Sequence, residues 1–258
     1  MRSFIVLTLL TFTSAAHAGW FGDCDHKARR NAQIETNGAT RVVVLAKAGS
    51  LRVTGREGVR GVTATGEACS SDAGLLKDIV LVSSRSGSVV TIEAKVPEHD
   101  GVSFFGGSSA SLDFTVVVPA NIAVEIHDTS GGMVVENLAT TSIDDTSGDI
   151  EVRHVRGDLT IRDTSGGIYV EDVSGSVHIP SDTSGSIEVR GAGAVTIDED
   201  TSGAVTIRNV KRNVFIGEKG SGSIFVSDVG GDFTVREKGS GHIDYERVRG
   251  RVSVPSRR

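Results

Sequence analysis

The stretch from Asp145 to Gly167 reads DTSGDIEVRHVRGDLTIRDTSGG, and the tetrapeptide Asp-Thr-Ser-Gly stands near both of its ends. Ser-Gly recurs at intervals of 17 to 19 residues through the second half of the 258-residue chain. Five copies read DTSG and the last two read KGSG; they begin at Asp128, Asp145, Asp163, Asp182, Asp200, Lys219 and Lys238. A constant period of this length is typical of a solenoid with one coil per repeat.

The residues between the Ser-Gly marks repeat as well. Ile150 and Val152 form one apolar pair, Leu159 and Ile161 form the next, and Gly157 separates the two. The same offsets follow Gly166, Gly222 and Gly241. Apolar residues two apart put alternate side chains on one face of a strand. Such a unit cannot bury its own apolar row, but stacked copies build a continuous core.

The sequence therefore predicts an all-β, single-domain parallel β-solenoid (β-helix) with two or three short strands per coil. A right-handed crossover is the general expectation for parallel strands. A hairpin meander fits less well, because it would not align like residues in one column. Scarce aromatic residues (5%), four prolines and 32 glycines agree with strands and tight turns.

The first half of the chain is less regular, and we expect it to supply an atypical terminal cap. It contains six strand-like stretches, and Ser71 to Lys77 reads as one helical turn with Leu75 and Leu76 covering an open end. The predicted organisation is a signal peptide at 1–18, an N-terminal cap segment at 19–40, a degenerate strand-rich half at 41–127 with a loop at 97–111, and regular repeats at 128–258.

The first residues carry the features of an export signal. Arg2 is followed by an apolar core from Phe4 to Phe12, and Ala16-His17-Ala18 is a cleavage signal. Export implies an oxidising compartment, where the two cysteines, Cys24 and Cys69, allow one disulfide. Two free thiols or a metal pair are the alternatives, and further cysteines or clustered histidines that would support them are missing from the sequence.

Charge is distributed unevenly along the chain. The formal net charge is −6, which argues against a general nucleic-acid binder. Residues 128–200 hold 15 acidic and 4 basic residues, for a net charge of −11, whereas residues 201–258 hold 6 acidic and 11 basic residues, for a net charge of +5. The predicted rod is therefore electrically polar along its axis.

The stretch VVVPANIAVEIHDTSGGMVVEN, from Val116 to Asn137, followed by SGDIEVRHVRGDLTI and its copies, resembles the putative-adhesin β-strand-repeat family of bacterial exported proteins, also called toast-rack. The resemblance covers roughly residues 40–254. It implies a β-solenoid at the cell envelope, sometimes tied to envelope-stress systems, and it carries over no catalytic residues. With the signal peptide and the two cysteines, it points to the periplasm of a Gram-negative cell.

The Asp-Thr-Ser-Gly motif has three interpretations. An aspartic protease uses Asp-Thr-Gly or Asp-Ser-Gly on two facing loops, whereas here Ser precedes Gly and the motif occurs five times. A structural Asx-turn is favoured, in which the carboxylate accepts the N–H two residues on and Gly takes a positive φ. Stacked carboxylates are also weak candidates for Ca²⁺, or for loose cation binding; these are Asp128, Asp145, Asp163, Asp182 and Asp200.

Two further motifs are expected to be structural. Arg156-Gly157-Asp158 resembles an integrin ligand, but it fills a turn slot in which only the Gly recurs. His127-Asp128-Thr129-Ser130 holds the residue types of a Ser–His–Asp triad, yet it is most simply a strand end followed by a turn. The seven histidines are dispersed, without metal-site spacing. We therefore predict no catalytic residue, no cofactor and no specific metal site.

Binding candidates lie elsewhere. Phe104 and Phe105 stand in the predicted loop, and Arg247, Arg249 and Arg251 gather at the C-terminal end. The arginines would either attract an anionic surface, such as lipid head groups or an acidic glycan, or, with Pro255, protect an open strand edge from aggregation.

These features predict a non-enzymatic exported envelope protein that binds or scaffolds an unidentified envelope protein or glycan. A polysaccharide-acting β-helix enzyme is one alternative, although one Trp and two Tyr offer few sugar subsites. A scaffold that self-assembles through stacked ends, as bactofilins do, is another.

Overall fold

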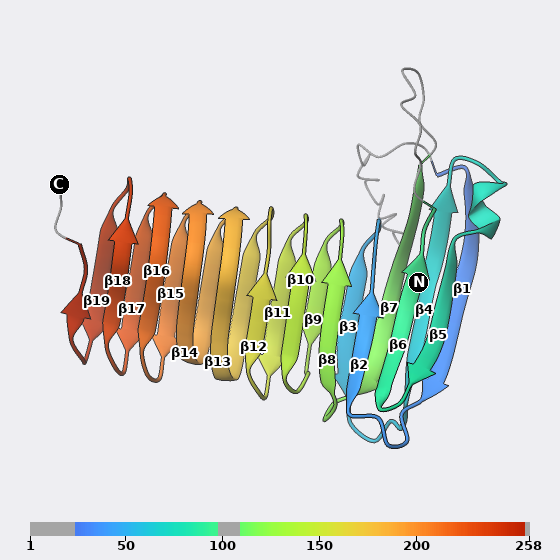
Figure 1. Cartoon of the computed structure of the whole chain (residues 1–258), viewed down its shortest axis with the longest axis horizontal. Helices are drawn as coiled ribbons and strands as arrows, with labels where there is room; N and C mark the ends of the chain where they lie inside the picture. The colour runs from blue at the N-terminus through green and yellow to red at the C-terminus, as the bar shows by residue number, and fades with distance from the viewer. Residues whose placement is uncertain (1–23, 98–108, 256–258) are drawn as a thin grey trace, which may run out of the picture.

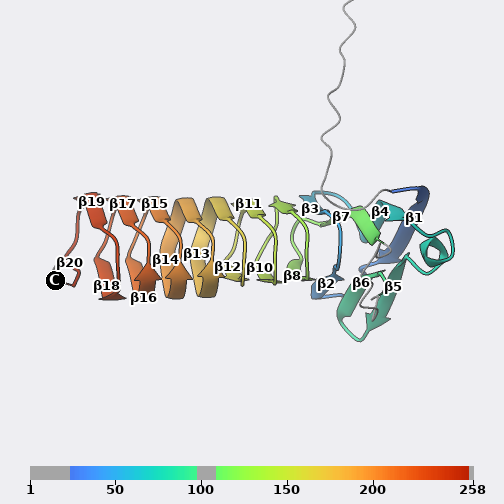
Figure 2. The same cartoon turned by 90° about the horizontal axis from the view of Figure 1, so that it is seen from above.

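The computed structural model describes residues 24–97 and 109–255, and it confirms a parallel β-solenoid of about seven turns. Each coil contributes one strand to each of two flat faces, which lie opposite one another in Figure 2. Face 1 contains β1 (His26–Glu35), β4 (Gly61–Ser70), β7 (Ala110–Pro119), β3 (Leu51–Arg56), β9 (Met133–Glu136), β11 (Ile150–Val155), the first parts of β13 (Ile168–Ser184) and β14 (Ile187–Ser202), β15 (Val205–Val210), β17 (Ile224–Val229) and β19 (Ile243–Val248), in that spatial order.

Face 2 is built in the same way. It contains β5 (Val80–Ser86), β6 (Val89–Lys95), β2 (Arg41–Leu45), β8 (Ala123–Asp128), β10 (Thr141–Asp145), β12 (Leu159–Arg162), the second parts of β13 and β14, β16 (Val214–Ser221), β18 (Phe233–Lys238) and β20 (Val252–Ser253). Because β13 and β14 run around the corner between the faces, they join both into one continuous sheet.

Like residues stack in columns between the two faces, as the repeat predicted. Ile150 pairs with Ile168, and Ile168 pairs with Ile187, on face 1. All three are almost completely buried, as are the other inward residues of the repeats that precede the last coil. Coil lengths of 17 to 19 residues are accommodated by one-residue register shifts, one of which lies between Thr160 and Arg162. The core is therefore a set of aliphatic ladders that runs along the rod.

The N-terminal end departs from this order. After β3 the chain leaves the stack and forms antiparallel pairs, β1–β4, β4–β7 and β5–β6, before β8 returns to the free side of β2. These strands widen the rod at this end (Figures 1 and 2). The expected helical turn is present as η1 (Leu75–Lys77), with Leu76 packed against the core. β1 was not anticipated from the sequence, whereas the six predicted strands are all present.

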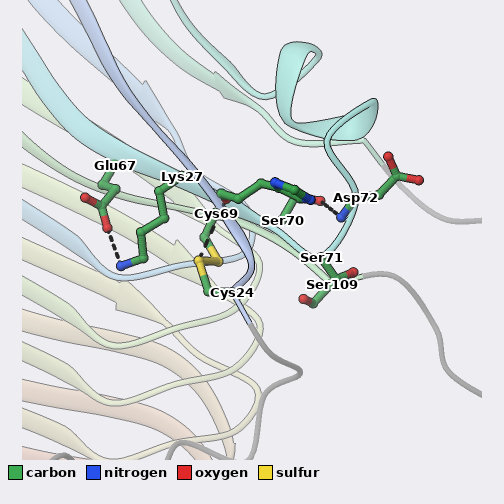
Figure 3. The surroundings of a disulfide bond; sticks show 9 residues. Cys24, Lys27, Glu67, Cys69, Ser70, Ser71, Asp72 and Ser109 are labelled. Carbon is green, nitrogen blue, oxygen red and sulfur yellow. Dashed lines mark hydrogen bonds and ion pairs between the residues drawn. A yellow bond between two sulfur atoms is a disulfide. The ribbon is translucent and has the colours of Figure 1, made fainter.

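The predicted disulfide joins Cys24 to Cys69, whose Cα atoms are 5.5 Å apart. It joins Cys24, two residues before β1, to the end of β4, beside an ion pair of 2.6 Å between Lys27 Nζ and Glu67 Oε1 (Figure 3). It closes a loop with a sequence separation of 45. On the chain-entropy model, a loop of this length contributes about 4 kcal/mol to stability. The disulfide thus ties the first strand of the cap to its neighbour.

Some predictions lie outside the described residues. They are the signal peptide at 1–18, the pair Phe104 and Phe105, and most of the loop at 97–111, although Ala110 and Ser111 of that range belong to β7. Within the two described segments, no helix is long and apolar enough to cross a membrane.

Candidate functional site

The Asp-Thr-Ser-Gly corner is fixed by close backbone stacking. Gly148 has φ 130°, and a Cβ placed there would lie 1.9 Å from the carbonyl oxygen of Gly131 in the preceding coil. Any larger residue would therefore push adjacent coils apart as well as adopt an unfavourable φ. The serine forms a hydrogen bond between adjacent coils, because Ser147 Oγ donates to the carbonyl oxygen of Thr129 at 3.1 Å. This explains why Ser-Gly is the constant part of the motif.

The aspartates of the motif point into the solenoid. Asp128, Asp145, Asp163, Asp182 and Asp200 are each 2–6% exposed, and we call them the carboxylate column. Their placement follows from strand alternation, because Ile126 and Ile143 point inward and the aspartates two residues later lie on the same side. The column is therefore an internal feature, which the Asx-turn prediction did not specify.

The Asx-turn prediction is only partly confirmed. Asp163 Oδ1 accepts the N–H of Ser165, two residues on, at 3.2 Å. Asp128 and Asp145 instead accept the N–H of the very next residue, at 2.7 and 2.8 Å. Neither carboxylate oxygen of Asp182 has a hydrogen-bond partner within the described residues. Burial without full hydrogen bonding penalises the charged form of these groups.

This environment raises the pKa of every member of the column. Burial raises the pKa of Asp128 and of Asp182 to about 7, with smaller contributions from the neighbouring aspartates. Burial also raises the pKa of Asp145 and of Asp163 to about 6. At neutral pH the column therefore carries less than its formal charge, which relieves repulsion between neighbours without an external cation.

Lys219 ends the carboxylate column. It is 2% exposed, and its Nζ lies 2.9 Å from Asp200 Oδ2 and 2.5 Å from the carbonyl oxygen of Ser221. Burial raises the pKa of Asp200, and the hydrogen bond and charge of Lys219 oppose that rise. The change from DTSG to KGSG is thus a buried ion pair between adjacent coils, and Lys219 is a cation supplied by the chain itself.

The geometry lends the calcium hypothesis no support. In residues 24–97 and 109–255, no group of three His, Cys, Asp or Glu side chains is placed to hold one metal ion. The carboxylates also face the core, so a divalent cation from solvent would have to enter the packed interior.

The Arg-Gly-Asp sequence is engaged in structural contacts. Arg156 donates to Glu57 Oε1 and to the carbonyl oxygen of Ala120, each at 2.6 Å. Asp158 Oδ1 accepts the N–H of Ser176 in the next coil at 2.7 Å. Both charged side chains therefore hold the corner opposite Asp-Thr-Ser-Gly, in agreement with the structural interpretation of this motif.

The triad residues are not brought together. His127 points outward, with Nε2 2.8 Å from Glu125 Oε1 and Nδ1 3.4 Å from Asp144 Oδ2, whereas Asp128 is buried on the opposite side of the strand. A base and its orienting carboxylate must share one site for nucleophilic catalysis. His127 is therefore part of a surface ion cluster.

Outward side chains on face 1 form a second ordered array, which sequence reasoning missed. Tyr169 lies between Arg153 and Arg190, and each guanidinium is 5.9 Å from the ring centroid. Arg208 lies 5.1 Å from the ring of Phe225 and 3.4 Å from Glu188 Oε1. We call this array the arginine–aromatic ladder; its members are Arg153, Tyr169, Glu188, Arg190, Arg208 and Phe225. Strand pairing fixes the spacing of these side chains along the rod.

The predicted basic residues at the C-terminal end differ in their surroundings. Arg247 is neutralised by Asp228, with two contacts of 2.6 and 2.9 Å, and by Glu246 at 2.7 Å. Its φ of 52° continues a column of left-handed bends, which also includes Asn137, His154, Asp172, Asn209 and Asp228. Arg249 and Arg251 are exposed at the last turn and make no ion pair within the described residues. Only these two remain available to an anionic partner.

Comparison with known proteins defines the fold. No family model matches the chain, and no curated protein matches it. A protein from Parabacteroides distasonis, described as a putative lipid binding protein, is 16% identical with a TM-score of 0.50, over 85% of this chain and 97% of that one. A protein from Bacteroides fragilis, described as a putative adhesin, is 13% identical with a TM-score of 0.48, over 91% of this chain and 100% of that one.

A third solved structure, a putative cell adhesion protein from Clostridium sporogenes, is 14% identical with a TM-score of 0.37, over 89% of this chain and 99% of that one. The neighbours are thus bacterial proteins described as putative adhesins, a putative cell adhesion protein and a putative lipid binding protein. The name of the repeat family is not confirmed, because no family model matches. At these identities the likeness concerns the fold, and the Parabacteroides distasonis protein supports it.

Proposed function

We propose that this chain is a non-enzymatic β-solenoid of the cell envelope, held in the periplasm, which acts as a binding or scaffold module. One observation carries the proposal. The carboxylates of the repeated corner face inward, whereas the rod presents regularly spaced side chains outward on its faces. Repeat proteins commonly use such extended, rigid surfaces for binding.

The disulfide and the export signal support the proposed compartment. The bond between Cys24 and Cys69 fits an oxidising environment, and residues 1–18 have the features of a cleaved leader. Both support an exported or cell-surface protein, and the periplasm is our proposal within that range. The neighbours' descriptions as adhesins and as a lipid-binding protein favour binding over catalysis and name lipid as one partner class to include in a test.

The test is saturable association of the labelled full chain with isolated envelopes of its source cell. We expect binding that unlabelled protein competes away. Parallel arms with extracted lipids, acidic glycans and protease-treated envelopes identify the partner class. Association no stronger than that of an unrelated exported protein would contradict the proposal, and so would sugar release from acidic glycans above background.

A matched pair of variants shows whether the arginine–aromatic ladder takes part. One variant changes Arg153, Arg190 and Arg208 to Ala on face 1. The control changes Arg162 and Arg236 to Ala on face 2, where they pair with Asp144 and Glu218. Weaker association of the first variant alone would assign the contact to face 1, and equal loss in both would indicate a general charge effect.

A further inference from the structure

The two ends of the rod differ in how far their apolar residues are buried. At the N-terminal end the antiparallel strands cover the core, and Val62, Ala68 and Ile79 are fully buried. At the other end none of the described residues covers the last coil, and Tyr245 is 48% exposed, the one exposed large apolar side chain among them. The remaining inward residues of this coil are only partly buried; we call the set of Ile243, Tyr245, Val248, Val252 and Val254 the open end.

These residues hold core positions of the repeat. Tyr245 pairs with the fully buried Val226 of the preceding coil, and its ring centroid lies 6.0 Å from that of Phe233. Ile243 pairs with Ile224, which is also fully buried. The open end is thus half of a coil-to-coil interface, and another layer with the same spacing would bury it as the earlier layers are buried.

The backbone at this end is a free strand edge. β19 pairs with β17 and β20 pairs with β18, and within the described residues no strand pairs with their other sides. Unpaired N–H and C=O groups along such an edge are a template for one more strand. An extended polypeptide can add to this edge through main-chain hydrogen bonds, with pockets for alternate side chains.

Charge at the open end selects an acidic occupant. Lys238 stacks on Lys219 in the corner column, but its Nζ contacts the carbonyl oxygen of Ser240, and no carboxylate of the described segments lies within ion-pair distance of it. Burial and the charge of Lys219 lower the pKa of Lys238, so a carboxylate beside it would be stabilising. Arg249 and Arg251 add positive charge to the same end. There β19 carries two exposed carboxylates, Asp244 and Glu246, of which Glu246 is paired with Arg247.

We propose that the open end binds an extended acidic segment of a partner protein, which adds to β19 as the next strand. Apolar side chains two residues apart would cover Ile243 and Tyr245, and a carboxylate five residues earlier would pair with Lys238. This spacing comes from the chain itself, where Asp182 precedes Ile187 and Asp200 precedes Val205 by five residues. The inference rests on the proposed binding function and names one site for it.

A second copy of the chain is a poorer occupant. Two open ends stacked on each other would bring like charges together, because residues 201–258 carry a net charge of +5. The other end of a second copy offers no open coil, since its core is covered by the cap. An anionic membrane would satisfy the arginines but would leave the strand edge of β19 unpaired. An extended acidic segment is therefore the occupant that pairs with the strand edge of β19, covers the apolar positions and places a carboxylate beside Lys238.

The probe is a synthetic peptide with the sequence of residues 182–197, DTSGSIEVRGAGAVTI, which stacks on the preceding coil in this register within the chain, as it would on the open end. Fluorescence anisotropy of the labelled peptide is followed against the full-length protein. We expect saturable one-to-one binding. Tyr245→Glu places a charge in the open end and should weaken binding by about tenfold or more. Phe215→Glu, an outward position of β16 on face 2 along the side of the rod, is the matched control and should leave affinity unchanged.

A double-mutant cycle tests the proposed carboxylate contact. Changing Asp182 to Asn in the peptide should weaken binding by about threefold, and the difference should vanish in the Lys238→Met protein. Circular dichroism and urea midpoints of the protein variants show that the rod remains folded.

Four results would overturn the proposal. The first two are a lack of saturable peptide binding and equal peptide binding by the Tyr245→Glu variant. The third is a dimer that forms as protein concentration rises and that only Tyr245→Glu abolishes. The fourth is displacement of the bound peptide by phosphatidylglycerol vesicles. Envelope association that survives Tyr245→Glu, without peptide binding, would overturn this inference and leave the proposed binding function intact. Loss of envelope association in wild-type protein would instead remove the function itself.

Discussion

The carboxylate column makes the stability of the rod fall as pH rises from 4 to 8. Asp182 shows this most clearly, because it is 2% exposed, neither of its oxygens has a hydrogen-bond partner among the described residues, and Asp163, Asp200 and Lys219 are the charged groups around it. Asn is nearly the same size as Asp and does not ionise. Asp182→Asn should therefore stabilise the protein at pH 8 and have little effect at pH 4.

The magnitude follows from the two pKa values. Burial raises the pKa of Asp182 from 3.8 to about 7, so the folded protein holds this proton more tightly than the unfolded chain does. The stability that comes with the neutral acid is complete below pH 3.8 and is lost as pH rises through 7. A difference of about three pKa units corresponds to about 4 kcal/mol, which is the upper limit of the gain from Asn at pH 8.

Urea unfolding followed by circular dichroism at pH 4 and pH 8 measures the effect. Glu199→Gln is the control, because Glu199 is an exposed carboxylate in the neighbouring strand β14, one residue before Asp200. This control should change stability by less than about 0.5 kcal/mol at either pH. If Asp182→Asn destabilised the protein equally at both pH values, the carboxylate would contribute a specific hydrogen bond and the argument from burial would be wrong.

Three further changes test other parts of the account. Lys219→Met leaves Asp200 buried without its partner at 2.9 Å. In the same urea assay it should lower the free energy of unfolding by about 3–5 kcal/mol at pH 8 and by less at pH 4. Equal losses of stability at the two pH values would contradict the ion pair. Gly166→Ala puts a Cβ 1.9 Å from the carbonyl oxygen of Gly148 and should lower the melting temperature sharply. Gly132→Ala is the control and should be tolerated, because a Cβ there meets nothing within 4 Å. Similar melting temperatures of the two variants would refute the close stacking. Changing both Cys24 and Cys69 to Ala should lower the free energy of unfolding by up to about 4 kcal/mol. Unchanged urea midpoints would show that the two segments already lie close together in the unfolded chain, so that the disulfide does not restrict it further.

The regular half of the fold could be predicted because its signals are local and repeated. Ser130, Ser147 and Ser165 mark successive corners, and the apolar pairs between them define the strands. The cap was only outlined, because its pairing depends on contacts between distant segments. Nothing in the order of the sequence shows that β4 to β6 leave the stack, or that β2 and β3 each lie between two later strands.

The burial of the carboxylate column was in principle predictable. Asp128 and Asp145 follow Ile126 and Ile143 by two residues, so strand alternation alone places them on the inward side. The expectation that buried residues are apolar concealed this signal. The column of left-handed bends was equally visible, because Asn, Asp or His stands before a recurring apolar residue, as in His154 before Val155.

The open end could not be identified from the sequence. Tyr245 has the spacing of a core residue, and its exposure depends on whether another layer follows. The arginines were noted as a group, but ion pairing separates Arg247 from Arg249 and Arg251. Such differences arise from neighbours in the preceding coil, which lie 19 residues away in the chain.

The central claim is that the Asp-Thr-Ser-Gly corners are structural and turn their carboxylates into the rod, which leaves the outer faces and the open end to bind partners. Carbon-13 NMR of the aspartate carboxyl groups, titrated with and without Ca²⁺, tests it most directly. We predict a group of five carboxyls with raised pKa, of which Asp128 and Asp182 titrate near 7 and Asp145 and Asp163 near 6, all indifferent to Ca²⁺. Titration of every aspartate near 4, with shifts on addition of Ca²⁺, would show that the column faces solvent and binds cations.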